Sequence, residues 1–339
     1  MKKITIIAEA GVNHNGSLKN ALKLIRIAAK AGADIVKSQV VEASVIQKKA
    51  VMANYQKKNT NKIETQYQMV KKLELNWDKA HPILINECKK NKIKFLTTAF
   101  SNEALLQLKK LGIETFKVPS GEITNLPYLK LLGSFNKKIL LSTGMANLRE
   151  IKRALKILIK AGTHKKKITL LHCNTAYPTP YEDANIKAIK TLRDKFKIKV
   201  GYSDHTLGNE ASIAAVTLGS EVIEKHFTIN KLMKGPDHIA SLNPKDLKLF
   251  IKSIRNTEKL LGSGKKVPSK SERENINVAR KSILSKININ KGDIFANHNL
   301  CIKRPGSGIS PIFWYKLLGK KSKKKYNYDE LIDKTELKR

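Results

Sequence analysis

The stretch GYSDHTLGNEASIAAVTLGSEVIEKHFTINKLMKGPDH, from Gly201 to His238, decides the fold of this chain. It contains two histidines, His205 and His226, and each follows a short β-branched run typical of a strand. The segment between the two runs, 209–218, has the composition of a helix. A strand–helix–strand unit puts both imidazoles at one end of a parallel sheet, where they can hold a divalent metal with open coordination positions. The alternative is two ordinary histidines at loop entries.

The same alternation of strand and helix continues outward from this stretch through residue 262. The predicted strands are Ile4–Ala8, Ile35–Lys37, Lys94–Thr97, Thr115–Val118, Ile139–Ser142, Ile168–His172, Lys199–Tyr202 and Val222–Glu224. The predicted helices are Leu18–Ala31, Glu64–Leu75, Lys79–Asn91, Glu103–Leu111, Leu126–Ser134, Leu148–Ala161, Ile186–Phe196, Asn209–Leu218 and Pro244–Leu261. An α/β chain with this many strand–helix units favours a closed (β/α)8 TIM barrel over residues 1–262. A doubly wound sheet is the weaker alternative, because no GxGxxG follows the first strand.

A second, smaller domain is predicted after the barrel. Residues 263–277 are polar, contain Gly and Pro, and indicate a linker. Residues 278–339 contain short strand-like pieces, Ser282–Lys286 and Leu300–Lys303, and a glycine-rich RPGSG. We expect this small β-rich domain to pack on the barrel or on a partner subunit, because it is too short for a large core of its own.

The composition limits the classes of function. The 339 residues carry a net charge of +38, from 57 Lys and only 9 Arg. The Lys is spread along the chain without Arg clusters, which argues against a nucleic-acid reader and favours a general compositional bias that also steers anionic substrates. The three cysteines form no CxxC pair, which suits a reducing cytoplasm. We also expect no membrane span and no nucleic-acid partner.

Polar side chains at the carboxyl ends of the predicted strands mark a candidate active site, because this face carries the catalytic groups of TIM barrels. Two lysines, Lys37 and Lys117, end strands that are otherwise apolar. Each is either a clamp for an anion or a nucleophile that forms a Schiff base. The hydroxyl residues at the same face are Thr98, Ser120, Ser142 and Ser203. Together they predict a site for a small phosphorylated or carboxylated substrate.

Two carboxylates and two further residues complete this predicted face. Glu9 ends the first strand, and Asp237 lies in the loop after the last, so both are candidates for proton transfer. Gln39 also belongs to the set, and His172 either supports the site or belongs to the core.

The order of the motifs resembles the sialic acid synthase family, which includes bacterial N-acetylneuraminate synthases and their legionaminate-type relatives. The resemblance covers nearly the whole chain and rests on AEAGVNHNG (Ala8–Gly16), VKSQ (Val36–Gln39), KVPSGE (Lys117–Glu122), LSTGMA (Leu141–Ala146), LLHCNTAYPTPYED (Leu170–Asp183), GYSDHT (Gly201–Thr206), EKHFT (Glu224–Thr228), GPDH (Gly235–His238) and KRPGSG (Lys303–Gly308). It implies a transferase that condenses phosphoenolpyruvate with an N-acetylated hexosamine and releases phosphate. It also implies an antifreeze-like (SAF) small domain that is swapped across a homodimer.

The resemblance also implies roles for individual residues. His205 and His226 would hold Mn²⁺ or Mg²⁺, and Glu9, Asp237 and Lys37 would be catalytic. The residues implied to bind phosphoenolpyruvate are Lys37, Thr98, Lys117, Ser120, Ser142 and Ser203. The residues implied to bind the sugar are Gln39, Asn174, Tyr177 and Arg304.

The identity of the sugar stays open at the level of sequence. We expect N-acetylmannosamine, and hence an N-acetylneuraminate synthase, with 2,4-diacetamido-2,4,6-trideoxymannose and a legionaminate product as the alternative. Ser38 stands where many members of the family carry Phe, and Ala176 where many carry Glu, so the sugar pocket is where this chain departs from the pattern. A Schiff-base pyruvate aldolase that uses Lys37 or Lys117 is a further alternative, and a basic nucleic-acid-binding barrel is the weakest.

Overall fold

The barrel consists of eight parallel strands in sequence order, and β1 closes on β8. The computed structural model describes residues 3–338. The strands are β1 Thr5–Gly11, β2 Ile35–Gln39, β3 Lys94–Thr98, β4 Thr115–Val118, β5 Lys138–Ser142, β6 Ile168–His172, β7 Lys199–Asp204 and β8 Val222–His226. The predicted TIM barrel is therefore confirmed.

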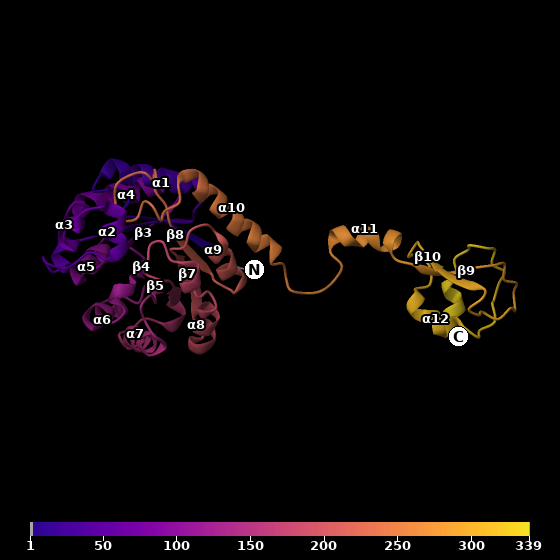
Figure 1. Ribbon diagram of the computed structural model, residues 1–339. Coiled ribbons are helices and arrows are strands. Elements are labelled where there is room, and N and C mark those ends of the chain that lie inside the picture. Colours follow the sequence, from indigo (N-terminus) through magenta and orange to yellow (C-terminus); the bar gives the residue numbers. More distant parts are fainter. Residues whose placement is uncertain (1–2, 339) are drawn as a thin grey trace. The chain divides into compact units, whose positions relative to one another are not determined.

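Helices return the chain from each strand to the next. They are α1 Leu18–Ala31, α2 Asn54–Thr60, α3 Gln66–Lys71, α4 Trp77–Lys90, α5 Asn102–Lys110, α6 Leu126–Ser134, α7 Leu148–Lys160, α8 Ala188–Phe196, α9 Glu210–Thr217 and α10 Pro244–Leu260. Figure 1 shows helices such as α6, α7 and α8 on the outside of the barrel strands. Several begin at the polar caps that the sequence offers. The side chain of Ser17 accepts a hydrogen bond from the amide of Asn20, and that of Asn147 accepts from Arg149 and Glu150.

The structure differs from the sequence-based prediction in several boundaries and in one additional helix. Strands β7 and β8 each run two residues further, to Asp204 and His226, so His226 lies within a strand rather than after one. The helix predicted over Glu64–Leu75 is the short α3 alone. Helix α2 was not predicted, because it contains no buried residue and so shows no apolar period.

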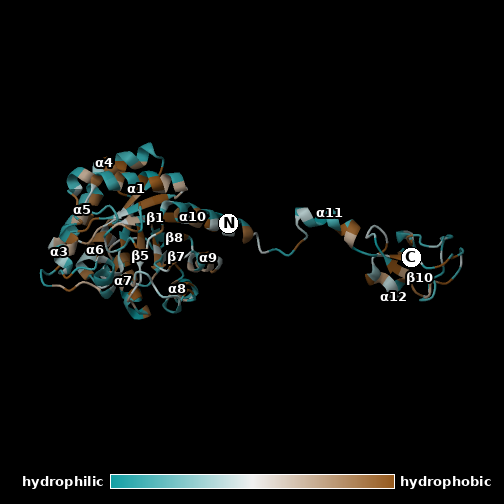
Figure 2. Ribbon diagram, turned by 45° about the horizontal axis from the view of Figure 1, so that its top comes forward, coloured by the Kyte–Doolittle hydropathy of each residue, from teal (hydrophilic) through white to brown (hydrophobic). Residues whose placement is uncertain are grey.

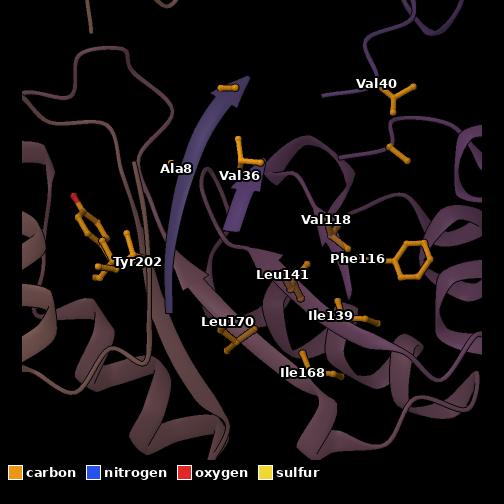
Figure 3. Packing of buried hydrophobic residues seen from close by; sticks show 14 of the residues in the cluster. Ala8, Val36, Val40, Phe116, Val118, Ile139, Leu141, Ile168, Leu170 and Tyr202 are labelled. Carbon is orange, nitrogen blue, oxygen red and sulfur yellow. The ribbon is translucent and has the colours of Figure 1, made fainter. Parts of the chain in front are cut away.

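The barrel strands separate two layers of apolar side chains. Alternate residues point outward and pack against the helices, and Figure 3 shows several of them, such as Val36 and Leu141. The inward-facing layer is formed by Ile7, Ile35, Leu96, Leu140, Leu171 and Val222. At Gly201 a Cβ atom would lie only 2.6 Å from the Leu171 side chain, so this layer has room for glycine alone at that position. Figure 2 shows the strands largely apolar and the outer helices largely polar.

A second compact unit begins at Gly264, and we call it the small unit. It contains α11 Lys270–Ala279, β9 Ser282–Ser285, β10 Leu300–Lys303 and α12 Trp314–Leu317. Strands β9 and β10 pair antiparallel over a core of Ile283, Ile289, Phe295, Leu300, Ile309, Leu317, Tyr326 and Ile332. Helix α11 lies mostly within 263–277, the segment predicted to be a linker, where Ser269 and Glu272 form a capping box that starts a helix.

Of the helices in the described part of the chain, none has the length and the apolar character that a membrane crossing requires.

Candidate active site

A cavity of about 640 Å³ opens at the carboxyl ends of the barrel strands, above the inward-facing apolar layer. Its lining includes most of the predicted residues, which are Lys37, Gln39, Thr98, Lys117, Ser120, Ser142, Tyr177, Ser203, His205, His226 and Asp237. These positions belong to seven different strands or to the loops that follow them, so only the closed barrel brings them together.

Two lysines and two glutamates form a buried charge cluster at the base of this cavity. The Lys37 Nζ atom lies 2.7 Å from Glu9 Oε2 and 3.6 Å from Glu224 Oε2, and Lys117 Nζ lies 2.7 Å from Glu224 Oε1. None of the four residues is more than 5% exposed. Glu224 therefore joins both lysines, and the four formal charges sum to zero if all are ionised.

Burial shifts the ionisation of this cluster in ways that depend on the neighbours. Burial is the main cause that raises the pKa of Glu9 to about 7, against the charge of Lys37. For Glu224, burial also acts to raise the pKa, but the charges of Lys117 and Lys37 outweigh it and hold that pKa below its ordinary value. Burial lowers the pKa of Lys117. Glu9 is thus the carboxyl group of this pair that is suited to exchange a proton near neutral pH.

Glu224 belongs to the candidate site, although our reading of the sequence assigned it only to a strand and to the EKHFT motif. It also accepts a hydrogen bond from the Ser203 hydroxyl at 2.8 Å. A signal was present, because Glu224 precedes His226 by two residues in β8 and alternate strand residues face the same side. If His226 faces the barrel interior, Glu224 must do so as well.

The predicted hydroxyl residues line the same cavity as the lysines. Thr98 Oγ1 accepts a hydrogen bond from Lys37 Nζ at 3.3 Å, and Ser142 is buried on the cavity wall. Ser120 Oγ accepts a hydrogen bond from the Gly144 amide and lies 3.3 Å from Cys173 Sγ. Cations, hydroxyls and a backbone amide around one cavity are the donors that a phosphate or carboxylate requires.

The two histidines face each other across the top of the cavity, with ring centroids 5.5 Å apart. His205 Nδ1 donates to the carbonyl of Asn174 at 2.5 Å, which leaves the lone pair on Nε2. The hydroxyl of Ser203 lies 3.3 Å from this Nε2, but its single proton is directed to Glu224. His226 Nδ1 is buried without a hydrogen-bond partner among the described residues.

These observations fit a divalent metal bound by two imidazoles. Burial lowers the pKa of His205 to about 4 and holds that of His226 well below its ordinary value, so both rings are neutral as metal binding requires. The carbonyl that fixes the His205 tautomer is a common outer partner of a metal-binding histidine. Within residues 3–338 no cluster of three or more His, Cys, Asp or Glu side chains suits a metal, so substrate or water would supply the other ligands.

The upper wall of the cavity carries aromatic and acidic groups. The ring of Tyr177 lies 4.0 Å from His205 and 5.0 Å from Tyr55, which comes from the unpredicted helix α2. Gln39 Nε2 donates to Glu9 Oε1 at 3.1 Å. Asp237 is buried, and burial raises its pKa to about 6. Tyr55 thus extends the predicted sugar pocket by a residue that no sequence pattern singled out.

The side chains of three further predicted residues lie outside the lining of the cavity. The Asn174 side chain bonds within its own loop, to the Ala176 amide and the Asp183 carbonyl, and only its backbone carbonyl serves the site. His172 faces outward, where its Nε2 contacts the Ala184 carbonyl, so it does not support the cavity. Arg304 is exposed on the small unit.

Ser38 also faces away from the cavity, because it alternates with Lys37 and Gln39 along β2 and contacts Thr97. Its difference from the family pattern therefore does not alter the cavity wall.

The model of the NeuB family matches residues 24–266, which is more than half of the chain. The chain belongs to the NeuB family. The N,N'-diacetyllegionaminic acid synthase of Campylobacter jejuni is 55% identical to it over 333 residues, which cover 98% of this chain and 99% of that protein. The protein of the same name from Legionella pneumophila is 43% identical, over 90% of this chain and 86% of that protein.

A solved structure supports the same assignment. The N-acetylneuraminic acid synthetase of Leptospira borgpetersenii, crystallised with citrate, is 34% identical with a TM-score of 0.71. The match covers 81% of this chain and 90% of that one. This member of the NeuB family is accordingly an enzyme of the phosphoenolpyruvate-condensing transferase type, and its substrates are small molecules.

Proposed function

We propose that this enzyme is an N,N'-diacetyllegionaminate synthase, which condenses phosphoenolpyruvate with 2,4-diacetamido-2,4,6-trideoxymannose and releases phosphate. The observation that carries the proposal is the 55% identity to a legionaminic acid synthase over nearly all of both chains. The N-acetylneuraminic acid synthetase of known structure is less similar, at 34% identity. Our first expectation from sequence, N-acetylmannosamine as acceptor, therefore becomes the second candidate.

Phosphoenolpyruvate would bind at the base of the cavity. Its phosphate and carboxylate require several donors, which Lys37 and Lys117 supply together with the hydroxyls of Thr98, Ser120, Ser142 and Ser203. Each lysine is neutralised by a glutamate before the ligand arrives. When Glu9 takes up a proton, the two lysines face one carboxylate only and attract an anion more strongly.

The reaction joins C3 of phosphoenolpyruvate to the aldehyde carbon of the open-chain sugar, and water adds at C2 before phosphate leaves. The aldehyde oxygen gains a proton and the attacking water loses one, so the site needs both an acid and a base. Glu9 and Asp237 are suited to these steps, because burial raises their pKa values to about 7 and about 6. Lys37 lies beside Glu9 and would stabilise its charged form once the proton has left.

His205 and His226 are the residues that would hold Mn²⁺ or Mg²⁺. A divalent ion bound there would act as a Lewis acid that polarises the sugar aldehyde. The lone pair on His205 Nε2 and the unpartnered His226 Nδ1 support this assignment. The carbonyl of Asn174 would keep the His205 ring in the orientation that ligation needs.

The acceptor sugar would lie against the upper wall, near Gln39 and Tyr177, with Asn174 acting through its loop. We propose that Arg304 contacts an acyl group of the sugar and that the small unit is an antifreeze-like domain exchanged within a homodimer.

The Schiff-base aldolase is not favoured. A Schiff base needs a neutral amine. Burial acts toward that form of Lys37, but the charges of Glu224 and Glu9 outweigh it and raise the Lys37 pKa. Lys117 lies 2.7 Å from Glu224 in a buried ion pair, so a substrate carbonyl would have to displace that contact.

The deciding experiment measures phosphate release from phosphoenolpyruvate with each of the two sugars, with EDTA and after Mn²⁺ is restored. We expect a higher kcat/KM with 2,4-diacetamido-2,4,6-trideoxymannose and loss of turnover in EDTA. A preference for N-acetylmannosamine would return the assignment to a neuraminate synthase. No phosphate release with either sugar would overturn the proposal altogether.

A further inference from the structure

A buried ion pair lies directly behind the two histidines, on the outer side of the barrel wall. Asp204 precedes His205 at the end of β7, and Lys225 precedes His226 in β8. The two residues are register partners in neighbouring strands, and Lys225 Nζ lies 2.8 Å from Asp204 Oδ2. Their side chains are 0% and 2% exposed. Because strand residues alternate, they point away from the cavity while the histidines point into it.

Both members of the ion pair make further hydrogen bonds, and those to Thr206 hold the backbone next to His205. Asp204 Oδ1 accepts from the amide and the hydroxyl of Thr206 at 2.9 and 2.8 Å. Lys225 Nζ donates to the carbonyl of Thr206 at 2.7 Å. The backbone amide, the backbone carbonyl and the hydroxyl of Thr206 thus all bond to the same ion pair. His205 lies between Asp204 and Thr206, so its backbone is held on both sides.

Helix α9 provides the last contact. Ser212 Oγ donates to Asp204 Oδ2 at 2.5 Å, which ties the helix that connects β7 to β8 to the same carboxylate. One ion pair therefore links both strand ends that carry a histidine and the helix between them.

Stability alone gives little reason for this arrangement. Taking two charges out of water costs about as much as their attraction returns, so apolar side chains of similar size would serve a barrel wall equally well. What an ion pair with this many directed contacts adds is a fixed geometry. The distance between two imidazoles depends on the relative position of the strand ends, and that is what Asp204 and Lys225 fix.

We propose that Asp204 and Lys225 are positioning residues that hold His205 and His226 at the separation a shared divalent cation requires. This inference rests on the proposed function, because it assumes that the two histidines bind the metal. Neither residue touches substrate or metal, and both act through the backbone of the neighbouring histidine.

The test compares Mn²⁺ affinity among variants of the full chain, from the EPR signal of the free ion, without any turnover. Asp204→Asn keeps an oxygen for Thr206 but places an amide N–H₂ group opposite Lys225. Lys225→Met removes the charge and keeps the length. We expect the Kd for Mn²⁺ to rise about 10- to 100-fold in each, as for other outer partners of metal ligands.

Asp34→Asn is the matched control. Asp34 pairs with Arg255 and the Ile6 amide just before β2, at the opposite end of the barrel. This variant should lose thermal stability and leave the Kd for Mn²⁺ within about twofold of that of the unmodified chain. If Asp204→Asn lowers the melting temperature as Asp34→Asn does and binds Mn²⁺ equally well, the pair is merely structural and the inference is wrong.

A milder variant covers the case in which the charge changes prevent folding. Ser212→Ala removes one contact to Asp204 and keeps both charges, and we expect its Kd to rise severalfold, whereas an unchanged Kd would contradict the inference. Failure of the proposed function would give a different result. If the unmodified chain does not bind Mn²⁺ and turns over without metal, the histidines do not have the proposed metal-binding role.

Discussion

Replacing Glu224 by Gln tests the charge cluster on which the proposed site depends. The substitution keeps the shape of the side chain and removes the negative charge that faces both lysines at 2.7 and 3.6 Å. Lys37 retains Glu9, but Lys117 loses the one ion pair in which it takes part among residues 3–338. Breaking a buried pair by removing one partner costs about 3–5 kcal/mol, because the other charge stays buried.

We expect this loss to appear as a large fall in the thermal midpoint of the barrel. For a protein of this size, 1 kcal/mol corresponds to about 2–4 °C, so the midpoint should fall by roughly 6–20 °C. Added phosphoenolpyruvate should recover more stability in Glu224→Gln than in the unmodified chain, since its anionic groups replace the lost charge. The assay is differential scanning calorimetry with and without ligand.

Glu103→Gln is the control, because Glu103 is exposed in the first turn of α5 and should change stability by no more than about 0.5 kcal/mol. Equal midpoints for Glu224→Gln and Glu103→Gln would refute the reasoning that Lys117 depends on this carboxylate.

Three further predictions concern single residues. His226→Ala should abolish Mn²⁺-dependent phosphate release while the circular dichroism of the barrel is unchanged, and full activity would contradict the ligand assignment. Burial raises the pKa of Asp237 from 3.8 to about 6, so its carboxyl favours folding below pH 3.8 and this contribution is lost as the pH rises through 6. Asp237→Asn should therefore gain up to about 3 kcal/mol of stability relative to the unmodified chain between pH 4 and pH 8 in urea unfolding, and a pH-independent difference would rule this out. Arg304→Ala should raise the KM for the sugar more than that for phosphoenolpyruvate, and equal effects on both would count against a role in sugar binding.

The fold could be predicted from the sequence because each strand–helix unit carries local signals of its secondary structure. Helix caps such as Ser17 and Asn147 and the β-branched runs of the strands depend on near neighbours in the chain. Helices without such signals were missed. Helix α2 has no buried residue to give a period, and α11 lies in a polar segment where only its capping box marks a start.

The candidate site was predictable only in part. Lysines and histidines at strand ends are visible in sequence, because polar residues that interrupt apolar runs are rare and costly to bury. Which carboxylate pairs with which lysine is not visible, since Glu224 meets Lys117 from 107 positions away. Tyr55 was missed as well, because it lies on α2, a helix without a buried residue to give an apolar period.

By itself, then, the sequence determined the barrel, the family pattern and the chemical character of the residues at its mouth. Those properties follow from local periodicity and from the order of motifs along the chain. Tertiary structure alone decided which charges are paired and how His205 and His226 are held. Closing the barrel sets these relations, because it brings β1 against β8 and so places Glu9, Glu224 and both lysines in one buried space.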